Sequence, residues 1–280
     1  MRTVRFVGPG RAGGSLALAL RRAGWDVVGF IGRGEDLQGV ADGVDLVVVS
    51  TPDDAIAGVA RQIRPTPTTV VLHLSGVLGP DALYPHPRRA ALHPLVPLPD
   101  PEVGAIRLSS GITFAVAGDP MAAEVAESLG GRALVLGDRD RSSYHAAACI
   151  AANHVVALLG QVERVAAAAG LPLDAFLDLT RSAVDDVARL GPRRALTGPA
   201  SRGDRDTLER HRVALDPAER TGYDAGVALV EQLAHGDPAR SEPDFDGDLL
   251  AEAGVGAEAG VGVGAGVGVG AGVGVGAGVG

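Results

Sequence analysis

Apolar positions in the first half of the chain fall into short runs that alternate with stretches of helical spacing. Runs rich in β-branched residues and bounded by glycine or polar turns predict strands. Strand-like runs occupy residues 3–8, 26–32, 45–52 and 68–76, and the segments RAALHPLVPL and GITFAVAG. Residues 13–24 and the segment DDAIAGVARQI have the spacing of amphipathic helices. This alternation predicts an α/β fold with a parallel, doubly wound sheet.

The pattern changes in the middle of the chain, where strand-like runs stop and the helical periods lengthen. Residues 141–170 read as one long helix, and further helical segments follow. We therefore predict an α/β domain over residues 1–135 and an all-helical domain over residues 136–250. Glycine then alternates with valine and alanine over residues 251–280, a composition that is costly to order. We expect a disordered low-complexity tail there, and not a membrane span.

Composition narrows the functional classes. The chain has 280 residues, of which 46% are hydrophobic and 3% aromatic, so the core must consist mainly of alanine, valine and leucine. A net charge of −9 argues against a nucleic-acid partner, whose phosphates need a basic surface. The basic residues are all arginine, so no catalytic lysine is available. A single cysteine and an N-terminus without a signal-peptide pattern predict a cytoplasmic protein.

A glycine motif lies between the first predicted strand and helix. GPGRAG matches G-x-G-x-x-G through Gly8, Gly10 and Gly13. Gly8 would form the tight turn, Gly10 would let a pyrophosphate approach the backbone, and Gly13 would let the helix pack close to the strand. The helix N-terminus offers free N–H groups and a partial positive charge to phosphates. An ordinary glycine-rich turn is the alternative. The predicted dinucleotide-binding residues are Gly8, Pro9, Gly10, Arg11, Ala12 and Gly13.

The residue after the second strand indicates which dinucleotide binds. NAD-binding proteins place an acidic residue there for the ribose hydroxyl, whereas this chain has Arg33. A guanidinium at this position can pair with the 2′-phosphate of NADP. We therefore predict NADP, with NAD less favoured. Glu35 or Asp36 could instead bind the ribose.

Polar residues follow the strands at the edge where ligands of open α/β sheets bind. We expect the backbone of Thr51 and Pro52 to contact the cofactor, and Asp53 or Asp54 to cap the next helix. Ser75 could bind a substrate carboxylate or carbonyl, with a turn role as the alternative. His93 is a candidate acid or substrate ligand, because histidine titrates near neutrality.

The segment SSYHAAACIAANHVV sets polar groups into an apolar helix. At about 100° per residue, His145, Cys149 and Asn153 share one face, with Tyr144 on its flank and His154 pointing away. The spacing of the histidine and cysteine suits a metal, but no second pair of ligands follows, so we expect no metal site. The cysteine is expected to be a small core residue.

Several segments together resemble a bacterial oxidoreductase family that pairs a Rossmann-like domain with a helical domain called DUF2520. They are VGPGRAGGSLALAL, DLVVVSTPDDAI, LHLSG, ALHPL and LTGPASRGDRDTLERH. The resemblance covers about residues 2–250. Wider relatives are the 6-phosphogluconate-dehydrogenase-like enzymes, with β-hydroxyacid dehydrogenases, pyrroline-5-carboxylate reductase and F420-dependent NADP reductases among them. The resemblance implies an NADP-linked reductase that forms a homodimer through its helical domain and has a cleft between its domains.

One departure from these relatives matters for mechanism. Several of them use a lysine on the first long helix of the second domain, with an asparagine four residues later. Asn153 fits the asparagine, and Cys149 stands at the lysine position. The expected proton source is therefore His145, His93 or a bound water, while Asn153 and Ser75 orient the substrate.

The predicted function is NADP-dependent reduction of a small carbonyl or imine by hydride transfer in the interdomain cleft. F420 is a further possible co-substrate. The alternative is a non-catalytic NADP(H)-binding sensor or scaffold dimer.

Overall fold

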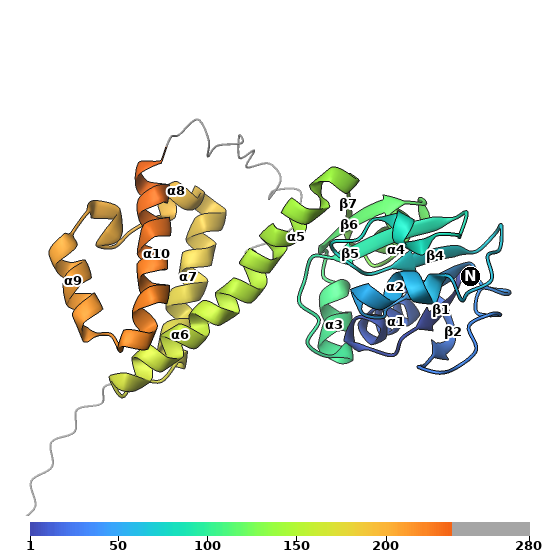
Figure 1. Cartoon of the computed structure of the whole chain (residues 1–280), viewed down its shortest axis with the longest axis horizontal. Coiled ribbons are helices and arrows are strands. Elements are labelled where there is room, and N and C mark those ends of the chain that lie inside the picture. Colours follow the sequence, from blue (N-terminus) through green and yellow to red (C-terminus); the bar gives the residue numbers. More distant parts are fainter. Residues whose placement is uncertain (237–280) are drawn as a thin grey trace, which may run out of the picture. The chain divides into compact units, whose positions relative to one another are not determined.

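The computed structural model describes residues 1–236, which fall in one compact unit (Figure 1). The tail predicted over residues 251–280 lies outside the described residues, as does the end of the predicted helical domain.

A seven-stranded sheet occupies the first part of the chain, in the order β2-β1-β3-β4-β5-β6-β7. All neighbouring strands are parallel except β5 and β6. The order reverses between β1 and β3, which creates a crevice at the carboxyl ends of these strands. The predicted α/β fold is confirmed. The strands are β1 (Thr3–Val7), β2 (Asp26–Ile31), β3 (Leu46–Val49), β4 (Val70–His73), β5 (Arg89–Pro94), β6 (Thr113–Gly118) and β7 (Arg132–Val135).

Helices cover both faces of the sheet, and β3 shows why its sequence is apolar throughout. Leu46 and Val48 join a core with α1, α3 and α4, whereas Val47 and Val49 join a core with α2. Alternate side chains of a strand point to opposite faces, so a strand covered on both sides has no polar position. The helices are α1 (Arg11–Arg22), α2 (Asp53–Ala60), α3 (Pro101–Leu108) and α4 (Met121–Ser128), with a short 3-10 turn η1 (Pro80–Leu83).

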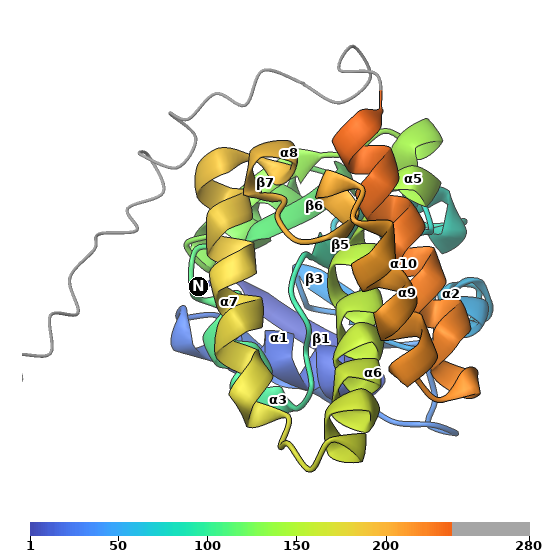
Figure 2. The same ribbon diagram turned by 90° about the vertical axis from the view of Figure 1, so that its left-hand side faces the viewer.

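Only helices follow β7 within the described residues, as predicted. The predicted long helix is present, but a π-helical turn divides it into two α-helical parts. Among the helices after β7, α10 contacts α6 and α8, and α7 contacts α8 (Figures 1 and 2). The elements are η2 (Asp138–Asp140), α5 (Arg141–Cys149), the π turn η3 (Ile150–His154), α6 (Val155–Ala168), α7 (Asp174–Leu190), α8 (Pro192–Ala195), η4 (Ala200–Arg202), α9 (Arg205–Ala214) and α10 (Pro217–His235).

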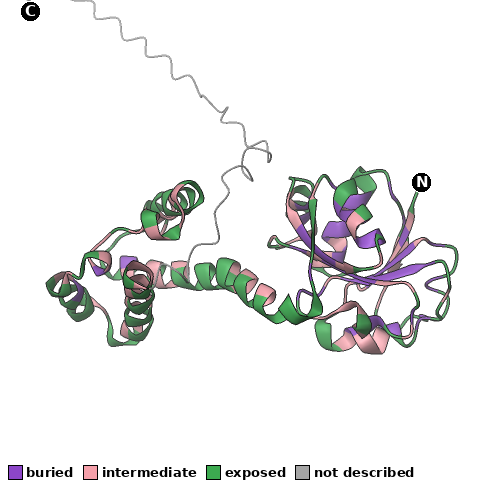
Figure 3. Cartoon of the chain, turned by 90° about the horizontal axis from the view of Figure 1, so that it is seen from above, coloured by how far each residue is buried: buried purple, intermediate pink, exposed green. Residues whose placement is uncertain are grey.

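Burial differs sharply between the two parts. The central strands β3 and β4 are fully buried, while the edge strand β7 and most of the helices after it are exposed (Figure 3). From residue 141 to residue 236 the buried residues are Arg141, Ala166, Ala200 and Leu208. The helix over Asp138–Ala168 is also long and apolar enough to cross a membrane, judged by length and composition alone. This part of the chain therefore presents apolar surface that nothing within the described residues covers.

Candidate functional site

The glycine turn joins β1 to α1 by close backbone contacts. Gly8 has a φ of +99°, and a Cβ there would lie 2.9 Å from the carbonyl oxygen of Ser50, just past β3. A Cβ on Gly13 would collide with the Ser50 side chain and lie 2.8 Å from the Gly8 carbonyl oxygen. The Ser50 hydroxyl donates to that same carbonyl over 2.7 Å. Glycine at both positions thus allows a tight turn that draws α1 against the end of β3.

The N-terminus of α1 is open to a phosphate group. Its N-cap residue is Gly10, no side chain caps the helix, and no acidic residue lies in its first turn. A Cβ on Gly10 would meet only the Ser50 carbonyl, at 3.9 Å. Nearby, the buried hydroxyl of Thr51 has no hydrogen-bond partner, and Pro52 is the N-cap residue of α2. Free helix N–H groups beside a backbone without side chains fit the pyrophosphate of a dinucleotide.

The loop after β2 leaves one charged side chain unpaired. Glu35 accepts a hydrogen bond from the Gly32 N–H over 2.9 Å. Asp36 accepts one from the Gln38 N–H over 3.0 Å. Arg33 is exposed, and the described residues give it neither a hydrogen bond nor an ion pair. Both acids that could have bound a ribose therefore hold the loop, and the guanidinium remains available.

The tips of β3 and β4 are joined by a side-chain hydrogen bond. The Ser75 hydroxyl donates to Asp53 over 2.9 Å. The same oxygen accepts from the N–H groups of Val77, at 3.3 Å, and Leu78, at 3.1 Å. The prediction that Asp53 caps α2 is wrong, because Pro52 is the N-cap residue and the carboxylate turns to the serine. The substrate contact of Ser75 stays a prediction, and in this structure its hydroxyl is fully bonded within the protein.

His73 at the end of β4 supports the same loop. The Ser75 N–H donates to its Nδ1 over 3.2 Å, so Nε2 carries the hydrogen and donates to the Gly79 carbonyl over 3.0 Å. Burial lowers the pKa of His73. It is therefore a neutral histidine that fixes the loop.

Two histidines converge on Gly76, directly after this serine. A Cβ on Gly76 would lie 2.6 Å from Nδ1 of His145 and 3.0 Å from Nε2 of His93. The two rings form an edge-on pair with centroids 5.8 Å apart. Nδ1 of His145 is buried and has no hydrogen-bond partner. A side chain at position 76 would push the two imidazoles apart, so glycine permits this arrangement.

Tyr144 completes the group from α5. Its hydroxyl lies 2.7 Å from Nδ1 of His93, and the rings meet edge to face with centroids 5.6 Å apart. Burial, followed by the charges of His145 and Arg141, lowers the pKa of His93 to about 4, while Asp53 opposes the shift. Burial also raises the pKa of Tyr144. Both groups are therefore neutral at pH 7.

A pocket of about 540 Å³ brings the predicted helix face together with the end of β5. Cys149 lies half-buried in its wall, with Sγ 3.6 Å from Nε2 of His145. The expectation that this cysteine is a core residue is therefore wrong. The π turn begins directly after this cysteine and contains Asn153. Such turns are frequent at functional sites. The polar residues lining the pocket are His93, Tyr144, His145, Cys149 and Asn153.

Arg141, three residues before Tyr144, was not identified from the sequence as part of the site. Its side chain is 5% exposed, and its Nε donates to Asp138 over 3.0 Å. One of its terminal nitrogens is buried without a partner. Its charge lowers the pKa of His93, in the same direction as burial, and it opposes the larger effect by which burial raises the pKa of Tyr144. Nothing in the local sequence separates this arginine from the chain's many exposed ones.

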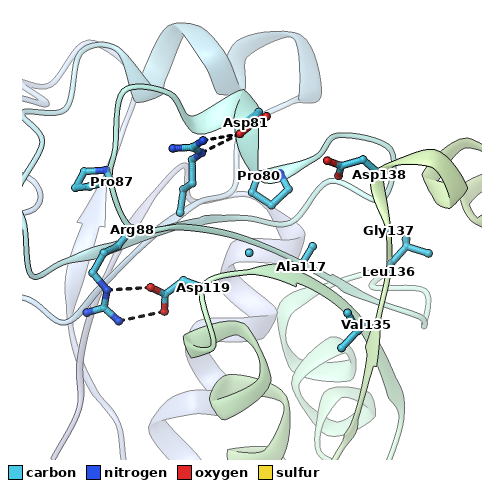
Figure 4. A pocket seen from close by; sticks show the side chains of 12 residues that line it. Pro80, Asp81, Pro87, Arg88, Ala117, Asp119, Val135, Leu136, Gly137 and Asp138 are labelled. Carbon is cyan, nitrogen blue, oxygen red and sulfur yellow. Dashed lines mark hydrogen bonds and ion pairs between the residues drawn. The ribbon is translucent and has the colours of Figure 1, made fainter.

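A second pocket, of about 550 Å³, has charged walls but fewer groups for chemistry. Arg88 pairs with Asp119, and Arg89 pairs with Asp81 (Figure 4). These charges neutralise one another, and the lining has no histidine, cysteine or tyrosine. Among the described residues, no group of three or more histidine, cysteine or acidic side chains could hold a metal ion. The pocket beside His93 is therefore the candidate site.

The helical part of the chain matches a known domain. Residues 111–228 match DUF2520, a domain of unknown function. The resemblance to Rossmann-like DUF2520 proteins is confirmed. The match begins before β6, so it takes in β6, α4 and β7 as well as the helices. No curated protein matches the chain.

Solved structures share the fold. An NADP oxidoreductase candidate of Bacteroides fragilis is 22% identical with a TM-score of 0.69, over 82% of this chain and 98% of that chain. The protein TM1727 of Thermotoga maritima is 24% identical with a TM-score of 0.62, over the same shares. A pyrroline carboxylate reductase of Plasmodium falciparum with NADP bound is 12% identical with a TM-score of 0.56, over 83% and 98%. At these identities the likeness concerns the fold.

Proposed function

We propose that this protein is an NADP-dependent oxidoreductase that reduces a small carbonyl or imine compound. One observation carries the proposal: a dinucleotide-type turn and a pocket with proton-bearing side chains share the carboxyl edge of one sheet. A series of contacts along that edge joins them. Ser50 bonds to Gly8, Asp53 bonds to Ser75, and Gly76 lies against the two histidines. The solved structures with this fold include two described as reductases, which supports the same reaction class.

The chain's own residues suit such a reaction. The cofactor, when bound, supplies the hydride. Gly8, Gly10 and the free N–H groups of α1 would hold its pyrophosphate, and Arg33 would bind the 2′-phosphate of NADP. Histidine and tyrosine groups in the pocket can exchange protons with the substrate, and the Asn153 amide can orient it. Alanine, proline, leucine and valine side chains form the rest of the wall.

The pocket volume suits a small substrate. A volume of about 540 Å³ falls in the range of small-molecule sites. Its lining is mainly apolar with a few polar groups, and the histidines among them would attract a polar carbonyl or imine group. The imine reductase of Streptomyces aurantiacus shares this fold, with 15% identity, a TM-score of 0.58 and coverage of 82% and 94%.

Turnover is the direct test. Purified protein with NADPH is offered a panel of aldehydes, ketones, 2-oxo acids and cyclic imines, and the loss of NADPH absorbance is followed. We expect substrate-dependent oxidation that Asn153→Ala lowers without changing NADPH affinity. Tight NADPH binding without turnover on any member would favour a sensor or scaffold. F420 is tested in the same assay as a further co-substrate.

The choice of NADP over NAD depends on Arg33. Replacing it by alanine removes the one unpaired charge beyond β2, so we expect the preference for NADPH over NADH to fall by about tenfold or more, the effect of losing a charge-assisted bond. Isothermal titration with both cofactors measures the ratio. Arg61→Ala, at an exposed position just past α2, is the control. An unchanged ratio in Arg33→Ala would refute the assignment.

We further propose that the protein is a cytoplasmic homodimer joined through its helical part. The near absence of buried residues from α6 to α10 supports a second copy, because a domain of this size needs a core. The apolar helix over Asp138–Ala168 also carries Glu163 and Arg164, and Arg164 pairs with Glu219 on α10. A helix engaged in this way suits a protein interface better than a lipid bilayer.

A further inference from the structure

The Tyr144 hydroxyl lies at the meeting point of the pocket and the paired histidines, and the sequence placed this residue only on the flank of the predicted face. We propose that Tyr144 is the catalytic residue that gives the proton to the substrate, and that His93 and His145 resupply it. This inference rests on the proposed reductase function. It assigns the proton to a group other than the histidines predicted from sequence.

The contact between Tyr144 and His93 favours the tyrosine as the final donor. Their atoms are 2.7 Å apart, and both side chains line the pocket. A neutral imidazole has one N–H donor and one acceptor nitrogen. With the hydrogen on Nδ1, His93 donates to the tyrosine oxygen, and the tyrosine hydrogen is left free for a substrate atom. His93 cannot serve equally well, because Nδ1 faces the tyrosine and Nε2 faces Gly76.

The neighbouring groups keep the pair in the required protonation states. Burial is the largest influence on both pKa values, lowering that of His93 and raising that of Tyr144. The positive charge of Arg141 and the neighbouring His145 ring also disfavour a charged His93, whereas Asp53 favours it. The net result is a protonated tyrosine beside a neutral imidazole at pH 7. A phenol is a far stronger acid than the alcohol or amine that reduction creates, so its proton moves downhill.

His145 provides the next step of the pathway. Its Nδ1 and the Nε2 of His93 lie within 2.6 Å and 3.0 Å of one point above Gly76. Two nitrogens that both lie this close to one point are near enough to each other for one water to bridge them. Nδ1 of His145 is buried without a partner, which is costly unless a ligand or water pairs with it. Its Nε2 contacts Sγ of Cys149 at the pocket wall.

The proton balance is complete. As hydride reaches the substrate carbon, the substrate oxygen or nitrogen takes the hydrogen of the Tyr144 hydroxyl. The tyrosine oxygen takes the Nδ1 hydrogen of His93, and Nε2 of His93 gains a proton from His145 or the bridging water. Each turnover therefore consumes one hydride and one proton from solvent, and the pair returns to its neutral state with the hydrogen restored.

Tyr144→Phe tests the proposal, because it removes the hydroxyl and keeps the ring against His93. We expect kcat to fall by about 10²–10⁴-fold, the usual contribution of a general acid, with NADPH affinity unchanged. The solvent deuterium isotope effect on kcat should change as well. Tyr223→Phe is the matched control, since the Tyr223 hydroxyl lies 2.9 Å from Nδ1 of His211 between α9 and α10. That variant should keep the activity of the unmodified protein.

A second variant separates chemistry from structure. His93→Asn should slow turnover, and imidazole added to the buffer should restore part of the rate. A purely structural role for His93 predicts no rescue. If the unmodified protein reduces no panel member, the reductase proposal fails and the relay with it. If the protein is active while Tyr144→Phe stays within about threefold of its kcat, well below a general-acid effect, only the relay is overturned.

Discussion

At the scale of the residue, the surroundings of a side chain decide its chemistry more than its identity does. The sequence predicts His93 as an acid because histidine titrates near neutrality. In the structure, burial and nearby positive charge lower its pKa to about 4, so it is neutral at pH 7. Its role as the acid stays untested, and a neutral imidazole can still pass a proton between its two nitrogens.

This shift predicts how stability depends on pH. Between about pH 4 and 6.5, unfolded His93 binds a proton that the folded residue does not, so stability falls as the pH falls through that window. His93→Asn removes the effect, and we expect the unmodified protein to lose up to about 3 kcal/mol relative to the variant over the window. Urea unfolding at a series of pH values measures the difference.

Comparing the unmodified protein with His93→Asn isolates the contribution of His93. Burial lowers the pKa values of His73 and His86 in both proteins, so their contributions cancel. Parallel stability curves for the two proteins would contradict the assigned shift.

At the scale of the element, the long helix around the π turn has two distinct parts. In α5 and η3 one side carries the polar pocket residues. In α6 the apolar side chains of Val156 and Leu158 are 70% and 54% exposed. A surface of this kind is unusual on a monomer and is typical of an interface.

Val156→Asp tests this interface. A charge in an apolar contact between two copies would be buried at high cost, so we expect the variant to elute as a monomer or to unfold at a lower temperature. Light scattering after size exclusion measures the mass. Ile106→Asp on α3, at a side chain that is 64% exposed, is the control and should leave the mass unchanged. A monomeric unmodified protein would contradict the proposed dimer.

At the scale of the whole molecule, the parallel strands carry distant residues to one edge. Ser75, His93 and His145 are far apart in sequence, yet they meet around Gly76 because β4 and β5 are neighbours and α5 packs beside them. The sequence predicted most strands and the helical second part correctly. It did not predict α3, α4 or β7, which have only eight, eight and four residues, too few to show a clear period.

The sequence by itself determined the features that depend on local physics. Periodicity predicts strand and helix, and the left-handed conformation of Gly8 and the close packing of Gly13 need glycine wherever the turn occurs. Tertiary structure alone decided the contacts of Asp53 with Ser75 and of His93 with Tyr144, and the burial of Arg141. These depend on strand order and on how closely α5 approaches the sheet. Such distances are set by packing across the molecule, and no short stretch of sequence encodes them.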